Sequence, residues 1–259
     1  CVYESGIDVY TLGQLLSRYK VSTLWLTAAF LNVVVKENVT ILKDLRYLLA
    51  GGDVLSRRAI EQVLDILGPS AQVVNGYGPT ENTTFTCCHS ISGSDINGQS
   101  SIPIGKPIAG TQVYVLNEVL EPLGVGMLGE LYTSGAGLAL GYLGAPALSA
   151  ERFIPNPFGQ AGTRLYRTGD LVRWRADGTL EFIGRADFQV KIRGYRIELG
   201  EVEAALARID GVKEVVAVAW EDEPGNKRLV VYVVGDVQEE YLRNCLRNRV
   251  PDYMQPSVY

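Results

Sequence analysis

Residues 75–81, with the order Asn-Gly-Tyr-Gly-Pro-Thr-Glu, combine side chains and backbone suited to binding a ligand. The apolar run 71–74 leads directly into them, so we expect a strand that ends in a tight loop. Glycines let the backbone approach a ligand closely, Tyr77 offers a ring for stacking, and Glu81 offers a hard oxygen to a cation. An ordinary strand-to-loop turn explains this stretch equally well, because Gly and Pro are the commonest turn residues.

Alternating strands and helices precede this loop and predict how it is positioned. The pattern predicts helices over 8–19, 28–36 and 56–67, and strands over 22–26, 47–50 and 72–75. Short connections between alternating strands and helices give parallel strands, whose carboxyl ends form the usual ligand site. We therefore expect Trp25, residues 49–53 and residues 75–81 to meet at one edge of a sheet.

The following stretch, residues 102–184, is predicted to be strand-rich. Strands are expected over 111–116, 129–133, 164–167, 171–175 and 179–183, with one helix over 147–153. This predicts a mostly antiparallel sheet or partial barrel, with Asp170 at a turn between two strands.

Residues 185–259 predict a compact α+β unit. We expect paired strands over 188–192 and 195–198, a helix over 201–209, strands over 212–220 and 229–234 separated by the polar loop 221–228, and a helix over 237–249. The predicted fold class is α/β. The first domain, 1–186, contains an αβ sheet (1–101) and a strand-rich, distorted-barrel part (102–186), and a small hinged domain follows at 187–259.

Composition narrows the classes of function. The 259 residues are 47% hydrophobic and 20% charged, which is typical of a soluble globular protein. The net charge of −5 argues against a nucleic-acid partner, and no stretch resembles a membrane helix or a signal peptide, so we expect a cytoplasmic location. Adjacent Cys87 and Cys88 precede the single His89, but no second ligand pair accompanies them, and reduced thiols are favoured over a metal site.

The chain resembles the adenylation domain of nonribosomal peptide synthetases, within the acyl-adenylate-forming superfamily. Five motifs carry the resemblance in the family's order: 75–81; the glycine-rich 129–143; Tyr-Arg-Thr-Gly-Asp-Leu at 166–171; the long run 184–203; and 250–256, with Val for Leu and Gln for Ile. The family's phosphate loop, its acid for the substrate amino group and its catalytic lysine are not among these residues. We therefore expect a fragment of a longer enzyme, inactive alone.

The resemblance implies that ATP and an amino acid give an aminoacyl-adenylate and pyrophosphate. The acyl group then passes to the phosphopantetheine thiol of a carrier domain, and a condensation domain is expected in the same polypeptide. Catalysis of this kind needs positioning and charge neutralisation rather than a general base, which suits a chain with one His.

The resemblance also implies residue roles. Thr80 would contact the α-phosphate, Glu81 would hold Mg²⁺, and Asp170 would bind the ribose hydroxyls. Asp187 is the expected hinge, and Gly194 would lie beside the pantetheine arm. The remaining nucleotide contacts are expected from Gly52, Asp53, Asn75, Tyr77, Phe182 and Arg185.

The substrate pocket, by the same resemblance, is lined by Trp25, Leu49, Gly51, Gly76, Thr84 and Phe85. None is charged, so a charged substrate side chain would lack a partner. The two glycines leave room within an apolar wall. The order Trp-Leu-Gly-Gly-Thr-Phe of these six residues is similar to the pocket pattern that the family associates with valine. We expect a small branched aliphatic substrate, valine first. Two alternatives stay open: an acyl-CoA or aryl-acid ligase of the same superfamily, and a non-catalytic nucleotide-binding fragment.

Overall fold

The computed structural model describes residues 7–97, 101–187, 189–192, 194–221 and 227–259. The chain divides by its internal contacts into two units, Cys1–Ala186 and Asp187–Tyr259, which are described separately below. Among the described residues, every helix is too short or too polar to span a bilayer.

The first unit begins with a five-stranded sheet in the order β1-β2-β3-β4-β5. Its strands are β1 (Thr23–Thr27), β2 (Tyr47–Gly51), β3 (Gln72–Tyr77), β4 (Cys87–Ile91) and β5 (Lys106–Pro107). β1, β2 and β3 are parallel, as predicted, so their carboxyl ends share one edge. β4 and β5 run antiparallel to their neighbours, which the expectation of a parallel sheet did not include.

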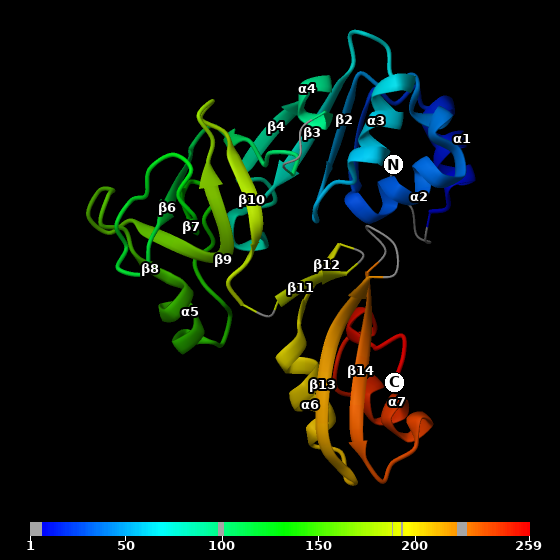
Figure 1. Cartoon of the computed structure of the whole chain (residues 1–259), viewed down its shortest axis with the longest axis vertical. Coiled ribbons are helices and arrows are strands. Elements are labelled where there is room, and N and C mark those ends of the chain that lie inside the picture. The colour runs from blue at the N-terminus through cyan, green and yellow to red at the C-terminus, as the bar shows by residue number, and fades with distance from the viewer. Residues whose placement is uncertain (1–6, 98–100, 188, 193, 222–226) are drawn as a thin grey trace. The chain divides into compact units, whose positions relative to one another are not determined.

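Helices cover one face of this sheet (Figure 1). They are α1 (Val9–Arg18), α2 (Ala28–Asn38) and α3 (Arg57–Ile66), with the 3-10 turn η1 at Val39–Leu42; the short helices η2 (Thr80–Asn82) and α4 (Gly93–Ile96) follow. Ser56 caps α3 by accepting a hydrogen bond from the Ala59 N–H, as predicted. The fully buried Leu48 and Ala50 pack into the core beneath the helices. Because side chains alternate along a strand, Leu49 and Gly51 lie on the other face.

The second half of this unit is an antiparallel sheet in the order β10-β9-β7-β6, with β8 paired to β9. Its elements are β6 (Thr111–Leu116), β7 (Gly129–Gly135), α5 (Pro146–Arg152), β8 (Phe153–Pro155), β9 (Arg164–Trp174) and β10 (Leu180–Arg185). The predicted strand-rich architecture is confirmed. The small core between the two sheets includes Tyr77, Cys87 and Val172.

One prediction in this region is wrong. Residues 164–167 and 171–175 do not form two strands with Asp170 at the turn between them; residues 164–174 form the single strand β9. β7 pairs Glu130 with Leu171 and Tyr132 with Arg167, so three residues of β9 oppose one residue of β7. Asp170 therefore lies in a bulge within a continuous strand.

The second unit is the predicted α+β arrangement. It comprises β11 (Gln189–Ile192), β12 (Tyr195–Glu198), α6 (Leu199–Ala207), β13 (Val212–Glu221), β14 (Lys227–Gly235), α7 (Glu239–Arg247) and η3 (Asp252–Met254). β11 pairs with β12 and β13 with β14, both antiparallel. Most of the predicted loop 221–228 lies outside the described residues. The core of this unit includes Val202, Leu206, Val231 and Leu246.

Candidate active site

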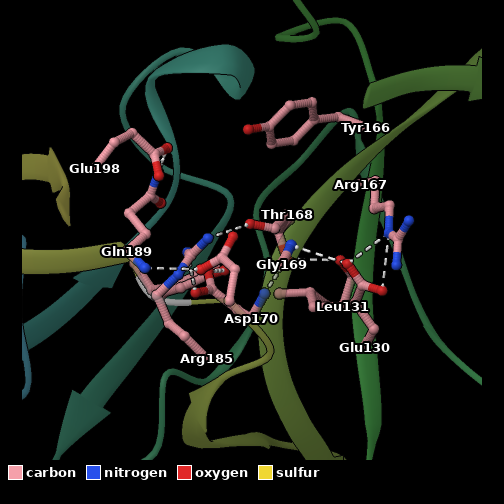
Figure 2. A network of polar contacts seen from close by, with 12 residues as sticks. Glu130, Leu131, Tyr166, Arg167, Thr168, Gly169, Asp170, Arg185, Gln189 and Glu198 are labelled. Carbon is pink, nitrogen blue, oxygen red and sulfur yellow. Dashed lines mark hydrogen bonds and ion pairs between the residues drawn. The ribbon is translucent and has the colours of Figure 1, made fainter. Parts of the chain in front are cut away.

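The bulge in β9 gives Asp170 its position (Figure 2). Gly169 has φ +74°, a left-handed conformation that favours glycine. The Thr168 hydroxyl donates to the Leu131 carbonyl over 2.6 Å and accepts the Asp170 N–H at 3.0 Å. One hydroxyl thus joins the bulge to β7 and fixes the backbone at Asp170.

Glu130, which lies on β7, also stabilises the bulge. Its Oε1 accepts the Gly169 N–H at 3.1 Å and the Arg167 Nε–H at 3.0 Å. The hydrogen bond to Glu130 raises the pKa of Arg167, against the opposing effect of burial. Neither Glu130 nor Thr168 was assigned a role from the sequence. Both lie inside quoted motifs, but their function depends on the pairing of β7 with β9.

The Asp170 carboxylate is buried and held at both oxygens. Arg185 Nη1 donates to Oδ1 over 2.6 Å, and the Tyr77 hydroxyl donates to Oδ2. Arg185 Nη2 also donates to the Thr168 carbonyl at 3.2 Å. Burial, and then the charge of Asp170, raise the pKa of Tyr77 well above its ordinary value, so its hydroxyl remains a donor.

The segment from Tyr77 to Thr86 is the tight loop that the sequence predicted. The Thr86 N–H donates to the Tyr77 carbonyl at 2.7 Å, and the Asn82 side-chain amide donates to Thr86 Oγ1 at 2.8 Å. Thr83 and Thr84 both have positive φ, at +49° and +66°. A Cβ on Gly78 would lie 2.4 Å from the Thr84 carbonyl oxygen, so this turn requires glycine.

Glu81 lies in this loop and is only 8% exposed. The Tyr142 hydroxyl donates to its Oε1 over 2.5 Å, and the Ala139 N–H donates to its backbone carbonyl at 2.8 Å. Burial, followed by the hydrogen bond to Glu81, raises the pKa of Tyr142. The sequence placed Tyr142 in a motif without a role, since 61 positions separate it from Glu81.

Strand register brings four of the six predicted pocket residues to one face. Trp25 pairs with Leu49, and Gly51 pairs with Gly76, so all four lie on the sheet face opposite the helices. A Cβ on Gly76 would lie 2.4 Å from Cε1 of Phe85, which shows that this ring covers Gly76. Trp25 is 44% exposed.

The other predicted nucleotide contacts are more scattered. The buried Asn75 donates its side-chain amide to the Pro103 carbonyl at 2.8 Å, on the face opposite Gly76. Asp53 accepts the Val54 N–H at 2.7 Å, beside Gly52 with φ +82°. Phe182 packs against the small core between the sheets.

Thr80 and two residues of the second unit complete the predicted set. Thr80 begins η2 and is exposed. Asp187 Oδ1 accepts the Gln189 N–H at 3.2 Å. Gly194 is exposed in the turn between β11 and β12, with φ +85°.

The side chains around Glu81 fit a Mg²⁺ ion that a bound triphosphate would help to hold. In the part of the chain that the structure describes, no three His, Cys, Asp or Glu side chains cluster as a metal cage. Mg²⁺ commonly uses one or two carboxylates and completes its shell with phosphates and water. Glu81 is the carboxylate that this loop supplies.

Family comparison agrees with this architecture. A family model described as AMP-binding enzyme matches residues 2–143, and one described as AMP-binding enzyme C-terminal domain matches residues 201–259. The first match alone spans more than half of the chain. The chain belongs to the AMP-binding enzyme family, and the predicted membership in an adenylate-forming family is confirmed.

Particular relatives are nonribosomal peptide synthetases. Tyrocidine synthase 3 of Brevibacillus parabrevis is 44% identical over 255 residues, covering 98% of this chain and 4% of that synthase. A solved structure of a holo NRPS protein with adenylation and PCP domains, bound to a vinylsulfonamide inhibitor, has a TM-score of 0.91 and 37% identity. The match covers 98% of the present chain and 44% of the chain in that solved structure. A four-domain nonribosomal peptide synthetase bound to AMP and glycine has a TM-score of 0.62 and 37% identity, over 97% of this chain and 18% of its own.

Proposed function

We propose that this chain is part of an enzyme that activates an amino acid with ATP as an aminoacyl-adenylate, for transfer to a phosphopantetheine carrier. The observation that carries the proposal is the buried Asp170 carboxylate, aimed by a bulge and held by Tyr77 and Arg185. A carboxylate that is held this firmly, next to a glycine-rich loop with a second buried carboxylate at Glu81, is suited to binding a nucleotide.

Asp170 would bind the ribose. A carboxylate has about four acceptor positions, and Tyr77 and Arg185 each use one in the contacts above. The remaining positions suit the two hydroxyls of a ribose diol. Arg185 then acts mainly by orienting Asp170, beside its expected contact with ribose or phosphate.

The chemistry proposed at the loop is adenylate formation. An oxygen of the amino-acid carboxylate attacks the α-phosphorus of ATP, the new P–O bond forms, and the bond to pyrophosphate breaks. The exposed Thr80 hydroxyl would donate to the α-phosphate, and Glu81 would hold Mg²⁺. Bound Mg²⁺ neutralises charge on the triphosphate. No general base is needed, because the attacking carboxylate is already ionised near neutral pH.

The proposed substrate is valine or a similar branched aliphatic amino acid. Support comes from the shared face of Trp25, Leu49, Gly51 and Gly76, and from Phe85, which covers Gly76. Thr84, the residue before Phe85, has a left-handed backbone. An apolar pocket of limited size favours valine over a charged or aromatic side chain, but discriminates a single methylene by only ~1–3 kcal/mol.

The proposed second step is transfer to the carrier thiol. The thiolate attacks the acyl carbon, a thioester forms, and AMP leaves. We place the hinge at Asp187 and the pantetheine path beside Gly194. Gly194→Leu in the complete enzyme should spare adenylate formation and impair thioester formation. Gly194→Ala is the matched control, because it imposes the same strain at φ +85° without the bulk.

The deciding experiment is amino-acid-dependent ATP–pyrophosphate exchange. It needs the complete domain that contains this chain, with the phosphate loop and lysine motif expected outside it. Exchange that valine supports best is the expected result. Exchange with aryl or fatty acids instead would favour an acyl-CoA or aryl-acid ligase. Nucleotide binding without exchange for any acid would favour a non-catalytic fragment.

A further inference from the structure

A tyrosine outside the roles assigned above contacts the carboxylate proposed to hold the metal. Tyr142 Oη lies 2.5 Å from Glu81 Oε1, and Glu81 is buried. Tyr142 belongs to the glycine-rich segment after β7, whereas Glu81 lies in the loop after β3. The contact therefore joins the two sheets of the first unit at the proposed site.

Several contacts hold the backbone and the side chain of Tyr142 in place. Its backbone N–H donates to Ser149 Oγ at 2.8 Å, and its ring meets the Phe153 ring edge-on, with 5.5 Å between centroids. Its hydroxyl also lies 3.4 Å from the Tyr166 hydroxyl. A side chain held from α5, β8 and β9 presents its hydroxyl in one place. A phenolic hydroxyl carries its proton at neutral pH and can donate it to the carboxylate.

We propose that Tyr142 is a positioning residue that orients the Glu81 carboxylate for the Mg²⁺–triphosphate. This rests on the proposed function. A glutamate side chain loses rotamer freedom when it is fixed, which opposes binding. A donor that holds Oε1 in advance removes much of that cost from the binding step.

A purely structural role would be to tie the glycine-rich segment to the loop. Two other contacts already do this: the Ala139 N–H donates to the Glu81 carbonyl, and Thr83 Oγ1 donates to the Gly137 carbonyl at 2.7 Å. Removing the Tyr142 hydroxyl leaves both of them in place. Loss of the Tyr142 hydroxyl should therefore affect the orientation of the Glu81 carboxylate more than the connection between the two segments.

The test is Tyr142→Phe in the complete domain. We expect the Mg²⁺ concentration for half-maximal pyrophosphate exchange to rise roughly tenfold, because a hydrogen bond to a charged group is lost. KM for the amino acid should stay close to wild type. Tyr114→Phe is the matched control, since that hydroxyl donates to Gln112 at 3.2 Å and its ring stacks on Phe158. An unchanged Mg²⁺ requirement would overturn the proposal.

A double-mutant cycle with Glu81→Gln separates positioning from general damage. If Tyr142 acts through Glu81, Tyr142→Phe should weaken binding of ATP in the presence of Mg²⁺, measured by calorimetry, in the wild type but hardly at all in Glu81→Gln. Equal losses in both backgrounds would contradict the inference. Calorimetry also distinguishes the two proposals. If the wild-type domain binds nucleotide but supports no exchange, the activation proposal is refuted, and the double-mutant cycle still tests the positioning role of Tyr142. If it binds no nucleotide, both proposals are refuted.

Discussion

Arg185 and Asp170 are register partners on the adjacent strands β10 and β9, and they form a buried ion pair. Nη1 and Oδ1 are 2.6 Å apart, and the two side chains are 12% and 5% exposed. Sheet pairing alone places the two side chains next to each other, and the bulge at Gly169 sets the direction of the carboxylate. The pair therefore connects the fold of the second sheet to the proposed nucleotide site.

Asp170→Asn should destabilise the first unit strongly. It replaces the charge in the ion pair with the largely buried Arg185 guanidinium by a neutral amide, and breaking a buried ion pair typically costs about 3–5 kcal/mol. Urea unfolding of the variant measures this free energy. Glu239→Gln is the control, because its i,i+4 pair with Arg243 is exposed and contributes only about 0.3–0.5 kcal/mol. Similar losses for both variants would contradict the assignment.

Thr168→Val should reduce both stability and nucleotide affinity. The substitution keeps the shape of the side chain but removes a buried hydroxyl with two backbone partners, the Leu131 carbonyl and the Asp170 N–H. Unsatisfied buried groups cost about 1–3 kcal/mol. Thr168→Ser retains the hydroxyl and should keep most of the affinity for ATP, measured by calorimetry. Equal effects of Val and Ser would mean that the methyl group, not the hydroxyl, holds the bulge.

Gly76→Ala should alter substrate preference through Phe85. The new methyl would lie 2.4 Å from the Phe85 ring, which must shift, so activity with valine should fall more than activity with alanine. Gly76→Ala combined with Phe85→Leu should recover part of the valine activity in pyrophosphate exchange. Gly51→Ala offers a contrast, because its Cβ would meet the Gly76 carbonyl oxygen at 2.0 Å. That backbone clash cannot be relieved by a side chain, and we expect it to lower the free energy of unfolding with no rescue by Phe85→Leu.

Alkaline pH should destabilise the first unit. Burial raises the pKa of the Cys87 thiol from 9.0 to about 12, so the folded state keeps a proton that the unfolded chain releases near pH 9. The stability from the neutral thiol is therefore complete below pH 9 and is lost as pH rises from 9 to about 12. The loss is at most about 1.4 kcal/mol per pH unit for this group.

Urea unfolding at about pH 8 and about pH 10.5, on either side of the ordinary thiol pKa, measures this effect. The raised pKa of Tyr77 adds a loss of the same sign at higher pH. Cys87→Ala should show a shallower dependence on pH than the wild type. An equal slope in the variant would assign the alkaline loss to other groups with a raised pKa, such as Cys88 and Tyr77.

The sequence by itself determined the elements whose signals are local. Residues 71–74 are apolar and lead into Asn-Gly, so the end of β3 and its tight loop were predictable. Ser56 before a helical pattern predicted a cap, and alternating helices and strands predicted the parallel pairing of β1, β2 and β3. Each of these depends on residues within a few positions of one another, where steric and hydrogen-bonding preferences act directly.

Only the tertiary structure decided how the site is assembled. Thr168-Gly169-Asp170 is typical of a turn, and becomes a bulge because β7 supplies the partners of a continuous β9. Tyr142 meets Glu81 across 61 positions of sequence. Phe85 covers Gly76 because two left-handed threonines fold the loop back over β3. Such contacts depend on how whole strands pair and pack, and their free energy is realised only once distant segments are already in place.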